Sequence, residues 1–360
     1  MTFQVAYGLS PPRDIDTNLC SYVFFALMAH SELFPELGSA PVPATMQPRL
    51  FKATGARVLP HVEWVEIQVK SVLSRVQGMP FKWSINPYRG CSHGCKFCYA
   101  RLTHWYLDQD GVNNWSSRIF VKVNAPEVLR HELAHHSWTR EEVHLGTATD
   151  PYQPAEGAYK ISRQILEALL AAQTPASIVT RSTMVVRDVD ILTQMARRPG
   201  AMVCFSIATM DAAVAREIEP DVPPPVRRLE ALRSLAQAGV PVAVLLAPVI
   251  PHITDHPKQL AAVVEAAKEY GASSLWTNAL HLGDVTRQAF FQYLEQRRPE
   301  LIPEYERMYR GKYAPSAYRH HVQEVVGALK ARHGLDRSSE SQRKHEDTPA
   351  HPSPQQLFLF

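Results

Sequence analysis

The sequence predicts an α/β fold in which six parallel strands alternate with helices, and three observations predict it. From about Trp83 onward, short apolar runs rich in β-branched residues alternate with longer segments of helical period. The runs recur about every 30 residues, the length of a strand–helix–strand unit with a right-handed crossover. Glycines mark where three helical segments end, because glycine adopts the left-handed conformation that stops a helix. These glycines are Gly200, Gly239 and Gly271.

Each expected strand is a short buried run. The strands lie at residues 82–86, 143–146, 177–180, 202–207, 242–247 and 274–277. The helical segments between them place apolar residues three and four positions apart, which gives each helix one buried face. The pattern allows both a curved partial (β/α) barrel and an open doubly wound sheet. In both, chemistry lies at the carboxyl ends of the strands. Two of the helical faces are Ile161, Ile165, Leu166 and Leu169, and Leu229, Leu232 and Leu235.

The chain divides into four parts. Residues 1–80 form a partly irregular N-terminal segment, of which 1–45 receive no role, and residues 81–283 form the core. Residues 284–334 are helical and rich in Arg and Tyr, which predicts an extension packed on the core. Residues 335–360 are polar and contain several prolines, so we expect a disordered tail that ends in a short apolar peptide.

Composition describes a globular chain from a reducing compartment. The 360 residues are 45% hydrophobic and 20% charged, which excludes disorder for the bulk of the chain. The net charge of +3 permits a nucleic-acid partner without arguing for one. An odd count of five cysteines, three of them crowded together, is no disulfide framework and indicates metal-binding thiolates in the cytoplasm. The longest apolar run near the start, Tyr22–Ala29, is too short to span a membrane, so we expect no membrane contact.

Three cysteines follow the first expected strand in a C-x3-C-x2-C motif. They are Cys91, Cys95 and Cys98. Three thiolates on one tight loop suit a [4Fe–4S] cluster and leave one iron open to react. The alternative is a zinc site with His93 or Cys204 as the fourth ligand. Structural zinc favours two paired C-x2-C units, and the sequence holds no second pair.

The residues around this motif carry a family resemblance. The segment from Asn86 to Arg101 resembles the cluster loop of radical S-adenosylmethionine (SAM) enzymes, and more closely that of the spore photoproduct lyase-like group. The resemblance extends over about residues 80–330. It implies a partial (β/α)6 TIM-type barrel with a helical C-terminal extension. The other matching motifs are Thr149–Pro154, Thr180–Ser182, Phe205–Ile207, Arg216–Pro220 and Ala247–Pro251.

The resemblance also implies a reaction. SAM binds the open iron, and one electron from a reductant such as flavodoxin or ferredoxin cleaves it to a 5′-deoxyadenosyl radical. The radical abstracts hydrogen from a substrate, so the cofactors supply the chemistry while the protein supplies position and exclusion of water. Similarity to spore photoproduct lyases implies a DNA lesion as the substrate, with lyase activity in DNA repair.

The same resemblance implies which residues hold SAM. Phe97 packs near the adenine, and Arg181 binds the carboxylate, because a guanidinium grips a carboxylate with two parallel hydrogen bonds. The chain departs from the pattern in having Gly-Thr-Ala-Thr-Asp where the superfamily often has Gly-Gly-Glu, and Arg181 where spore photoproduct lyases carry Lys. The other implied SAM contacts are Thr147, Thr149 and Asp150 after the second strand, Ser206 at the end of the fourth, and Arg216.

An H-E-x-x-H motif competes as a metal site. His131, Glu132 and His135 match the zinc-protease pattern on an expected helix that begins at Pro126. No third ligand motif follows, and the helix would lie outside the barrel, far from the strand ends. We therefore interpret the motif as a solvated helix face.

Cys204 has two interpretations. It lies on the fourth expected strand two residues before Ser206, so both side chains share one face of that strand. Spore photoproduct lyases are thought to use a cysteine as a hydrogen-atom donor, and Cys204 is the candidate here. The alternative is a small buried core residue, which is what a free cysteine usually is.

The last five residues form a candidate docking peptide. Gln356, Leu357, Phe358, Leu359 and Phe360 are apolar in character and stand at the end of a polar tether, which suits binding in a groove on another protein. They resemble the peptide with which bacterial DNA polymerases and repair proteins bind the β sliding clamp.

Three functions therefore remain open. The first is a radical SAM enzyme that acts on DNA, recruited by its tail and held through the Arg-rich segment 287–332, although acidic residues offset those arginines. The second keeps the radical chemistry and gives it an RNA, peptide or small-molecule substrate. The third is a non-catalytic iron–sulfur protein that senses redox state or recruits partners. The fold does not decide among substrates.

Overall fold

A seven-stranded sheet forms the centre of the protein. Its order is β11-β10-β9-β8-β7-β4-β3, and from β4 to β11 the strands are parallel, in the order in which the chain reaches them. The parallel strands are β4 (Trp83–Ile85), β7 (Val143–Leu145), β8 (Ala176–Thr180), β9 (Ala201–Ser206), β10 (Val242–Val249) and β11 (Ser274–Ala279). These confirm the six predicted strands. The computed structural model describes residues 52–58, 61–76, 81–107 and 109–335.

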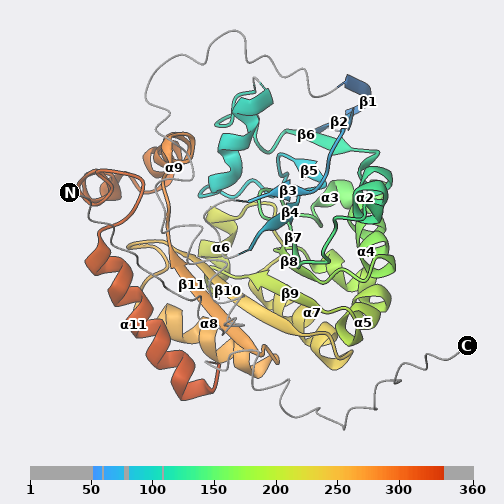
Figure 1. Cartoon of the computed structure of the whole chain (residues 1–360). Coiled ribbons are helices and arrows are strands. Elements are labelled where there is room, and N and C mark those ends of the chain that lie inside the picture. The colour runs from blue at the N-terminus through green and yellow to red at the C-terminus, as the bar shows by residue number, and fades with distance from the viewer. Residues whose placement is uncertain (1–51, 59–60, 77–80, 108, 336–360) are drawn as a thin grey trace, which may run out of the picture.

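The sheet forms an open, partial barrel. β11 stands at one edge and β3 (Ser74–Arg75), antiparallel to β4, stands at the other, so the sheet does not close on itself. Helices cover its outer side (Figure 1). The predicted apolar faces are buried on two of them, because Leu and Ile at three and four spacing point into the core. The covering helices are α2 (Ala125–Ala134), α4 (Ile161–Ala171), α5 (Val189–Arg197), α7 (Pro225–Gln237) and α8 (Pro257–Glu269).

Helices also form the C-terminal extension and the connections near the strand ends. α11 lies along α8 beside β11, and the short α10 precedes it (Figure 1). Gly334 ends α11 with a φ of 63°. The extension comprises α9 (Asp284–Arg297), η3 (Pro299–Leu301), α10 (Ile302–Met308) and α11 (Ser316–His333). The connections are η1 (Tyr99–Leu107), α3 (Pro154–Tyr159), η2 (Thr183–Asp188) and α6 (Ala212–Ile218).

A second sheet carries the cysteine loop, and the sequence did not predict it. Its order is β1-β2-β6-β5. β5 runs directly into Cys91, so this sheet fixes where the loop begins. β6 pairs with β2 and with β5 across long stretches of chain, and β5 is only two residues long, so no local pattern marks this sheet. The strands are β1 (Lys52–Val58), β2 (Glu63–Gln68), β5 (Tyr88–Arg89) and β6 (Arg118–Lys122).

Gly146 ends β7 at the edge of the site. Its φ is 92°, in the left-handed region, as are the φ values of the three predicted helix-stop glycines. A Cβ at Gly146 would lie 2.5 Å from the Cδ of Pro151 and 2.6 Å from the carbonyl oxygen of Val179. A Cβ at Gly239, which has a φ of 83°, would meet nothing within 4 Å. A side chain at position 146 would therefore clash with its neighbours, whereas one at position 239 would not.

This pair gives a matched stability test. We expect Gly239→Ala to lower the free energy of unfolding by about 1 kcal/mol, the cost of a left-handed alanine. We expect Gly146→Ala to cost about 3 kcal/mol, because overpacking against fixed backbone adds to that strain. Urea unfolding followed by circular dichroism measures both. Equal losses in the two variants would contradict the steric argument.

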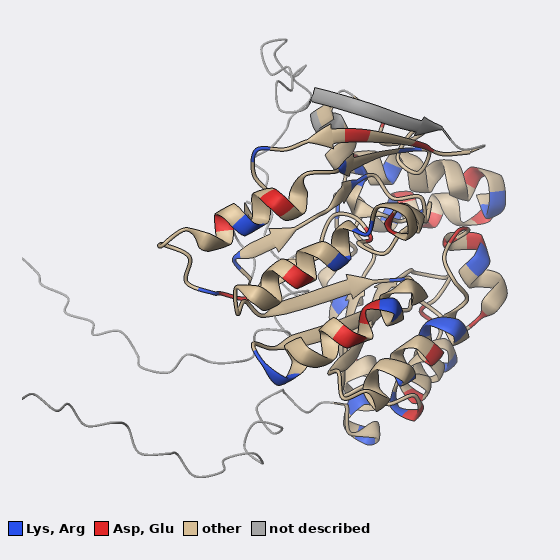
Figure 2. Ribbon diagram, turned by 90° about the vertical axis from the view of Figure 1, so that its right-hand side faces the viewer, with Lys and Arg blue, Asp and Glu red and all other residues tan. Residues whose placement is uncertain are grey.

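Acidic and basic residues are mixed on the face that Figure 2 shows. Figure 2 shows acidic and basic residues interspersed along the helices of the face drawn, with neither sign gathered on one side. This mixture agrees with the small net charge of +3. Within the described part of the chain, no helix is both long and apolar enough to cross a membrane.

Candidate active site

The cysteine loop is anchored to three neighbouring segments. The backbone N–H of Cys91 donates to the carbonyl of Trp115 at 3.2 Å, and that of Lys96 donates to the carbonyl of Ile218 at 3.0 Å. The N–H of Ser92 donates to Oε1 of the buried Gln153 at 3.0 Å. These bonds fix the loop above the carboxyl ends of β7 and β9.

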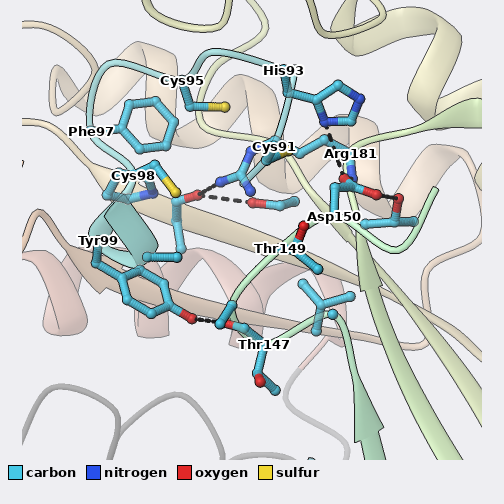
Figure 3. A pocket seen from close by; sticks show the side chains of 18 of the residues that line it. Cys91, His93, Cys95, Phe97, Cys98, Tyr99, Thr147, Thr149, Asp150 and Arg181 are labelled. Atoms are coloured by element: carbon cyan, nitrogen blue, oxygen red, sulfur yellow. Dashed lines mark hydrogen bonds and ion pairs between the residues drawn. The ribbon is translucent and has the colours of Figure 1, made fainter. Parts of the chain in front are cut away.

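The three cysteines line one pocket with residues from the strand ends. Figure 3 shows them on the loop, facing the segments that follow β7 and β8. Cys91 and Cys95 are 7% and 5% exposed, Cys98 is half-buried, and all three are free thiols. The pocket encloses about 1050 Å³ of empty space, its open mouth included.

The chemistry of this donor set fits a [4Fe–4S] cluster. Burial raises the pKa of both Cys95 and Cys98, so these thiols need a strong countercharge to become thiolates. A four-iron cluster held by Cys91, Cys95 and Cys98 would supply that charge. Among the described residues, no group of three His, Cys, Asp or Glu side chains is arranged around a single ion. The geometry therefore does not favour the zinc alternative.

The two expected fourth zinc ligands lie in different places: His93 lines the pocket beside Cys91 and Asp150, whereas Cys204 does not line it. His93 lies with Nδ1 3.3 Å from Oδ2 of Asp150. Burial acts to lower the pKa of His93, but Cys91 and Asp150 outweigh it and raise the value to about 10. Cys204 is 3% exposed and is not among the residues that line the pocket.

Asp150 joins the loop to β8. Its carboxylate accepts hydrogen bonds from Oγ1 of Thr180 at 2.7 Å and from the N–H of Tyr152 at 2.8 Å. It also accepts from the N–H of Arg181 at 2.7 Å. Burial alone would raise the pKa of Asp150, but His93 and these donors lower it. Asp150 is therefore a charged brace between two strand ends.

The two predicted threonines, Thr147 and Thr149, also form hydrogen bonds to neighbouring protein segments. Oγ1 of Thr149 donates to the carbonyl of Gly90 at 2.7 Å. Oγ1 of Thr147 donates to Oγ of Ser84 at 3.1 Å, and the hydroxyl of Tyr99 donates to the carbonyl of Thr147 (Figure 3). Both threonines line the pocket while their hydroxyl groups are engaged with protein.

Arg181 is the cation of the pocket. Its Nε donates to Oε1 of Glu219 at 2.9 Å, its Nη2 donates to the carbonyl of Ala247 at 3.3 Å, and its Cζ lies 5.4 Å from the ring centre of Phe97. Burial acts to lower the pKa of Arg181, but Cys95 and Glu219 outweigh it and raise the value. Among the described residues, Nη1 has no hydrogen-bond partner and is available to a carboxylate.

Glu219 links Arg181 to a second arginine. Its Oε2 accepts from Nη2 of Arg228 at 2.7 Å, and Arg228 is 1% exposed. Nη1 of Arg228 donates to the carbonyl of Ser206, the last residue of β9. Burial alone would raise the pKa of Glu219, but Arg228 and Arg181 lower it. This buried chain of charges holds Arg181 in place.

Sequence analysis missed several of these residues. The Glu219 position lay inside a matching motif without a role, and Arg228 gave no signal because it sits within an ordinary helix pattern. His144 and His281 also line the pocket. Burial lowers the pKa of His144, and burial together with Lys312 lowers that of His281 to about 4, so both imidazoles are neutral near pH 7.

The structure gathers all but one of the predicted SAM residues. Phe97, Thr147, Thr149, Asp150, Arg181 and Ser206 line the pocket with the cysteines. Arg216 does not line it; this residue lies on α6 and lines a separate hollow with Lys96 and Arg297. The sequence could not separate the two places, because Arg181 and Arg216 both follow strands of the same sheet.

The H-E-x-x-H motif is a solvated helix face, as interpreted. His131 and His135 are exposed on and just after α2. The carboxylate of Glu132 accepts from the N–H groups of Val72 and Leu73, at 3.1 and 3.0 Å. Glu132 therefore anchors the chain ahead of β3 rather than serving a metal.

Comparison with known proteins identifies the family. A model of the radical SAM superfamily matches residues 85–264, half of the chain. The chain belongs to the radical SAM superfamily. Within it, the fold is spore photoproduct lyase-like: one structure of spore photoproduct lyase covers 75% of this chain and 79% of its own with a TM-score of 0.59 at 15% identity.

The chain is also similar to two relatives in sequence and to a second structure in fold. An uncharacterised protein of Mycobacterium tuberculosis is 36% identical over 323 residues, 89% of this chain and 94% of its own. A radical SAM Nα-GlyT isomerase of Pseudomonas phage M6 is 26% identical over 171 residues, 47% of this chain and 34% of its own. Spore photoproduct lyase with bound AdoMet and dinucleoside spore photoproduct matches with a TM-score of 0.57 at 15% identity, over 72% of this chain and 76% of its own.

Separate substitutions of Arg181 and Arg216 test the predicted SAM contacts. We expect Arg181→Ala to weaken SAM binding about tenfold to a hundredfold, because a charge-assisted hydrogen bond is lost. Glu219 keeps its pairing with Arg228 in that variant, so the fold survives. We expect Arg216→Ala to change SAM affinity less than about twofold, because it lines another hollow. Equilibrium dialysis of SAM against cluster-loaded protein measures both, and equal losses would restore Arg216 as a SAM contact.

Proposed function

We propose that this radical SAM enzyme acts on a modified or damaged base in DNA. One observation supports the radical SAM chemistry: the three cysteines and the residues expected to hold SAM line the same pocket. A [4Fe–4S] cluster bound there supplies the electron that cleaves SAM to methionine and a 5′-deoxyadenosyl radical.

The chain's own residues bind and orient. Arg181 offers its guanidinium to the SAM carboxylate, and Glu219 sets the direction in which it points. Phe97, 5% exposed, gives an apolar ring on which an adenine can pack. Apolar side chains such as Trp115 and Leu280 complete the walls and exclude water that would quench a radical.

Three observations support DNA as the substrate. The fold resembles that of a lyase whose structure contains a dinucleoside photoproduct. A phage relative is named as an isomerase of Nα-GlyT. The C-terminal peptide resembles a clamp-binding motif, and it lies outside the described residues. RNA, peptide and small-molecule substrates are the alternatives within the same chemistry.

Anaerobic turnover tests the proposal. Reconstituted protein is mixed with SAM and dithionite, and 5′-deoxyadenosine is measured with ultraviolet-irradiated DNA, untreated DNA, RNA or no substrate. We expect 5′-deoxyadenosine in all mixtures and more of it with irradiated DNA. Equal amounts of 5′-deoxyadenosine in all mixtures would reject damaged DNA as the substrate. No 5′-deoxyadenosine in any mixture would favour the alternative of a non-catalytic iron–sulfur protein.

We also propose that the tail docks on the β sliding clamp. Leu357 and Phe360 would fill apolar pockets of a clamp groove, as short tethered peptides do. A fluorescent peptide of the last residues, titrated with a bacterial clamp, measures the affinity. We expect binding that is lost in a Leu357→Ala, Phe360→Ala peptide; no binding at tens of micromolar would reject the idea.

Cys204 stays a proposed hydrogen-atom donor. In the sheet it pairs in register with Val179, which lines the pocket, so the two side chains share the inner face. A donor role predicts that Cys204→Ala alters the distribution of products while cluster content stays unchanged. An unaltered distribution leaves Cys204 as a buried core residue.

A further inference from the structure

A second hollow lies behind the cysteine loop. It is formed by the loop, α6, α9 and the segment around Val112. Lys96 lines this hollow, whereas its neighbours Cys95 and Phe97 line the pocket. The loop therefore has two sides, one that faces the reacting centre and one that faces the hollow.

Besides the buried Arg101, three cations line the hollow without an ion-pair partner among the described residues. They are Lys96, Arg216 and Arg297, and among the described residues none of them forms an ion pair. Arg216 and Arg297 are exposed, and Lys96 is half-buried. The acid of the hollow, Glu217, is already engaged by Arg298 at 2.8 Å and by the hydroxyl of Tyr293 at 2.6 Å. The hollow therefore presents uncompensated positive charge on a surface that is otherwise mixed.

The hollow is connected to the cluster ligands by hydrogen bonds. Arg101 lines it, and Nη2 of Arg101 donates to the carbonyl of Cys95 at 3.1 Å. Nη1 donates to the carbonyls of Gly111 and Val112 at 3.2 and 2.9 Å, which fixes the guanidinium. On α9, Oγ1 of Thr286 donates to the carbonyl of Cys98 at 3.2 Å. Cys95 is thus bonded directly to a residue that lines the hollow, and Cys98 is bonded to α9, the helix that forms one of its sides.

We propose that the hollow is the docking site for a one-electron carrier protein with an acidic face around its redox centre. This inference rests on the proposed function, because it requires the cluster. In the step it serves, one electron leaves the reduced carrier and reduces the oxidised cluster, and no bond or proton is exchanged. Charge complementarity steers the carrier to the back of the loop, the side from which the ligand carbonyls are reached.

The position favours a carrier protein over a nucleic acid. A substrate must enter the pocket to react, and a molecule seated in the hollow is separated from the pocket by the cysteine loop. An electron needs no such entry. A phosphate backbone would satisfy the same three cations, so an oligonucleotide is one arm of the test.

Charge reversal on α9 tests the site without touching the loop. Gln292, Gln296 and Arg297 line the hollow and are exposed, so Gln292→Glu, Gln296→Glu and Arg297→Glu are combined in one variant. The matched control is Arg130→Glu with Arg332→Glu, two exposed arginines on α2 and α11 that change the net charge by the same amount. Full-length cluster-loaded protein is used throughout.

Binding of oxidised flavodoxin and reduction of the cluster by prereduced flavodoxin are the measurements. We expect the α9 variant to bind flavodoxin at least about tenfold more weakly, and the control to stay within about twofold of the wild type. Added salt should weaken the wild type toward the variant. Cluster reduction by dithionite should be equal in all three proteins, because dithionite needs no docking.

Two outcomes would overturn the inference. Unchanged flavodoxin affinity in the α9 variant is one. Loss of affinity for a short oligonucleotide, with flavodoxin affinity retained, is the other and would make the hollow a nucleic-acid site. Neither readout requires SAM cleavage, so a failure of the proposed function, seen as no 5′-deoxyadenosine with dithionite, is recorded separately.

Discussion

Replacing the three loop cysteines is expected to abolish iron binding and SAM cleavage together. The anaerobically reconstituted wild type should contain about four iron atoms per chain, and the Cys91→Ala, Cys95→Ala, Cys98→Ala variant should contain about none. The physical reason is that these are the only cysteines among the described residues that line the pocket. Iron analysis, visible absorbance and 5′-deoxyadenosine formation measure the effect. Iron retained by the triple variant would refute the cluster assignment.

Cys204 provides the matched control for that experiment. It is a fourth described cysteine outside any disulfide, it is 3% exposed, and it does not line the pocket. Cys204→Ala should keep the full iron content, because a small residue replaces a small residue away from the ligands. A loss of iron in this variant would make Cys204 a fourth ligand of the iron centre.

Removing the charge of Glu219 is expected to have the second largest effect. Glu219→Gln leaves Arg228, 1% exposed, and Arg181 without their shared carboxylate. Breaking a buried ion pair in this way costs about 3 to 5 kcal/mol of unfolding free energy. SAM binding should weaken as well, because Arg181 loses the partner that orients it. Urea unfolding at neutral pH and SAM dialysis measure the two effects.

Glu217 is the control two residues away. Its carboxylate pairs with Arg298 in a partly exposed position, with side chains 22% and 28% exposed. Glu217→Gln should therefore cost no more than about 1 kcal/mol. Equal losses in Glu217→Gln and Glu219→Gln would contradict the role given to burial.

The effect of Glu219→Gln depends on pH with a definite sign. The folded protein lowers the pKa of Glu219 below its usual 4.5, so the carboxylate contributes stability above that value. The contribution falls as pH drops from 4.5 through the lowered pKa. The stability difference between wild type and Glu219→Gln should therefore be full at neutral pH and shrink in acid. A constant difference across this range would falsify the linkage.

The parallel sheet could be predicted because its signals are local. The run at 242–247 became β10, buried along its whole length, and the glycine stops became left-handed residues at helix ends. The second sheet could not be predicted, since β5 is two residues long and pairs with β6 some thirty residues later. Only the folded chain brings such segments together.

The candidate site also combines features that the sequence could predict with features that it could not. The spacing of Cys91, Cys95 and Cys98 predicts them as the ligands, because one short loop would hold all three around one centre. Arg181 follows β8, where parallel-sheet chemistry is expected, and it lines the pocket. Arg216 follows the next strand and lines the other hollow. Sequence position placed both near strand ends and could not say which side of the loop each would reach.

The sequence by itself determined the strand–helix alternation and the family, and it predicted the three cysteines as cluster ligands. These properties rest on residue type and spacing over short stretches of chain. Tertiary structure alone decided the Arg181–Glu219–Arg228 chain, the brace at Asp150 and the basic hollow behind the loop. Each of these depends on which side chains meet after strands and helices have packed. It also depends on how burial and neighbouring charges then shift the pKa values of those side chains.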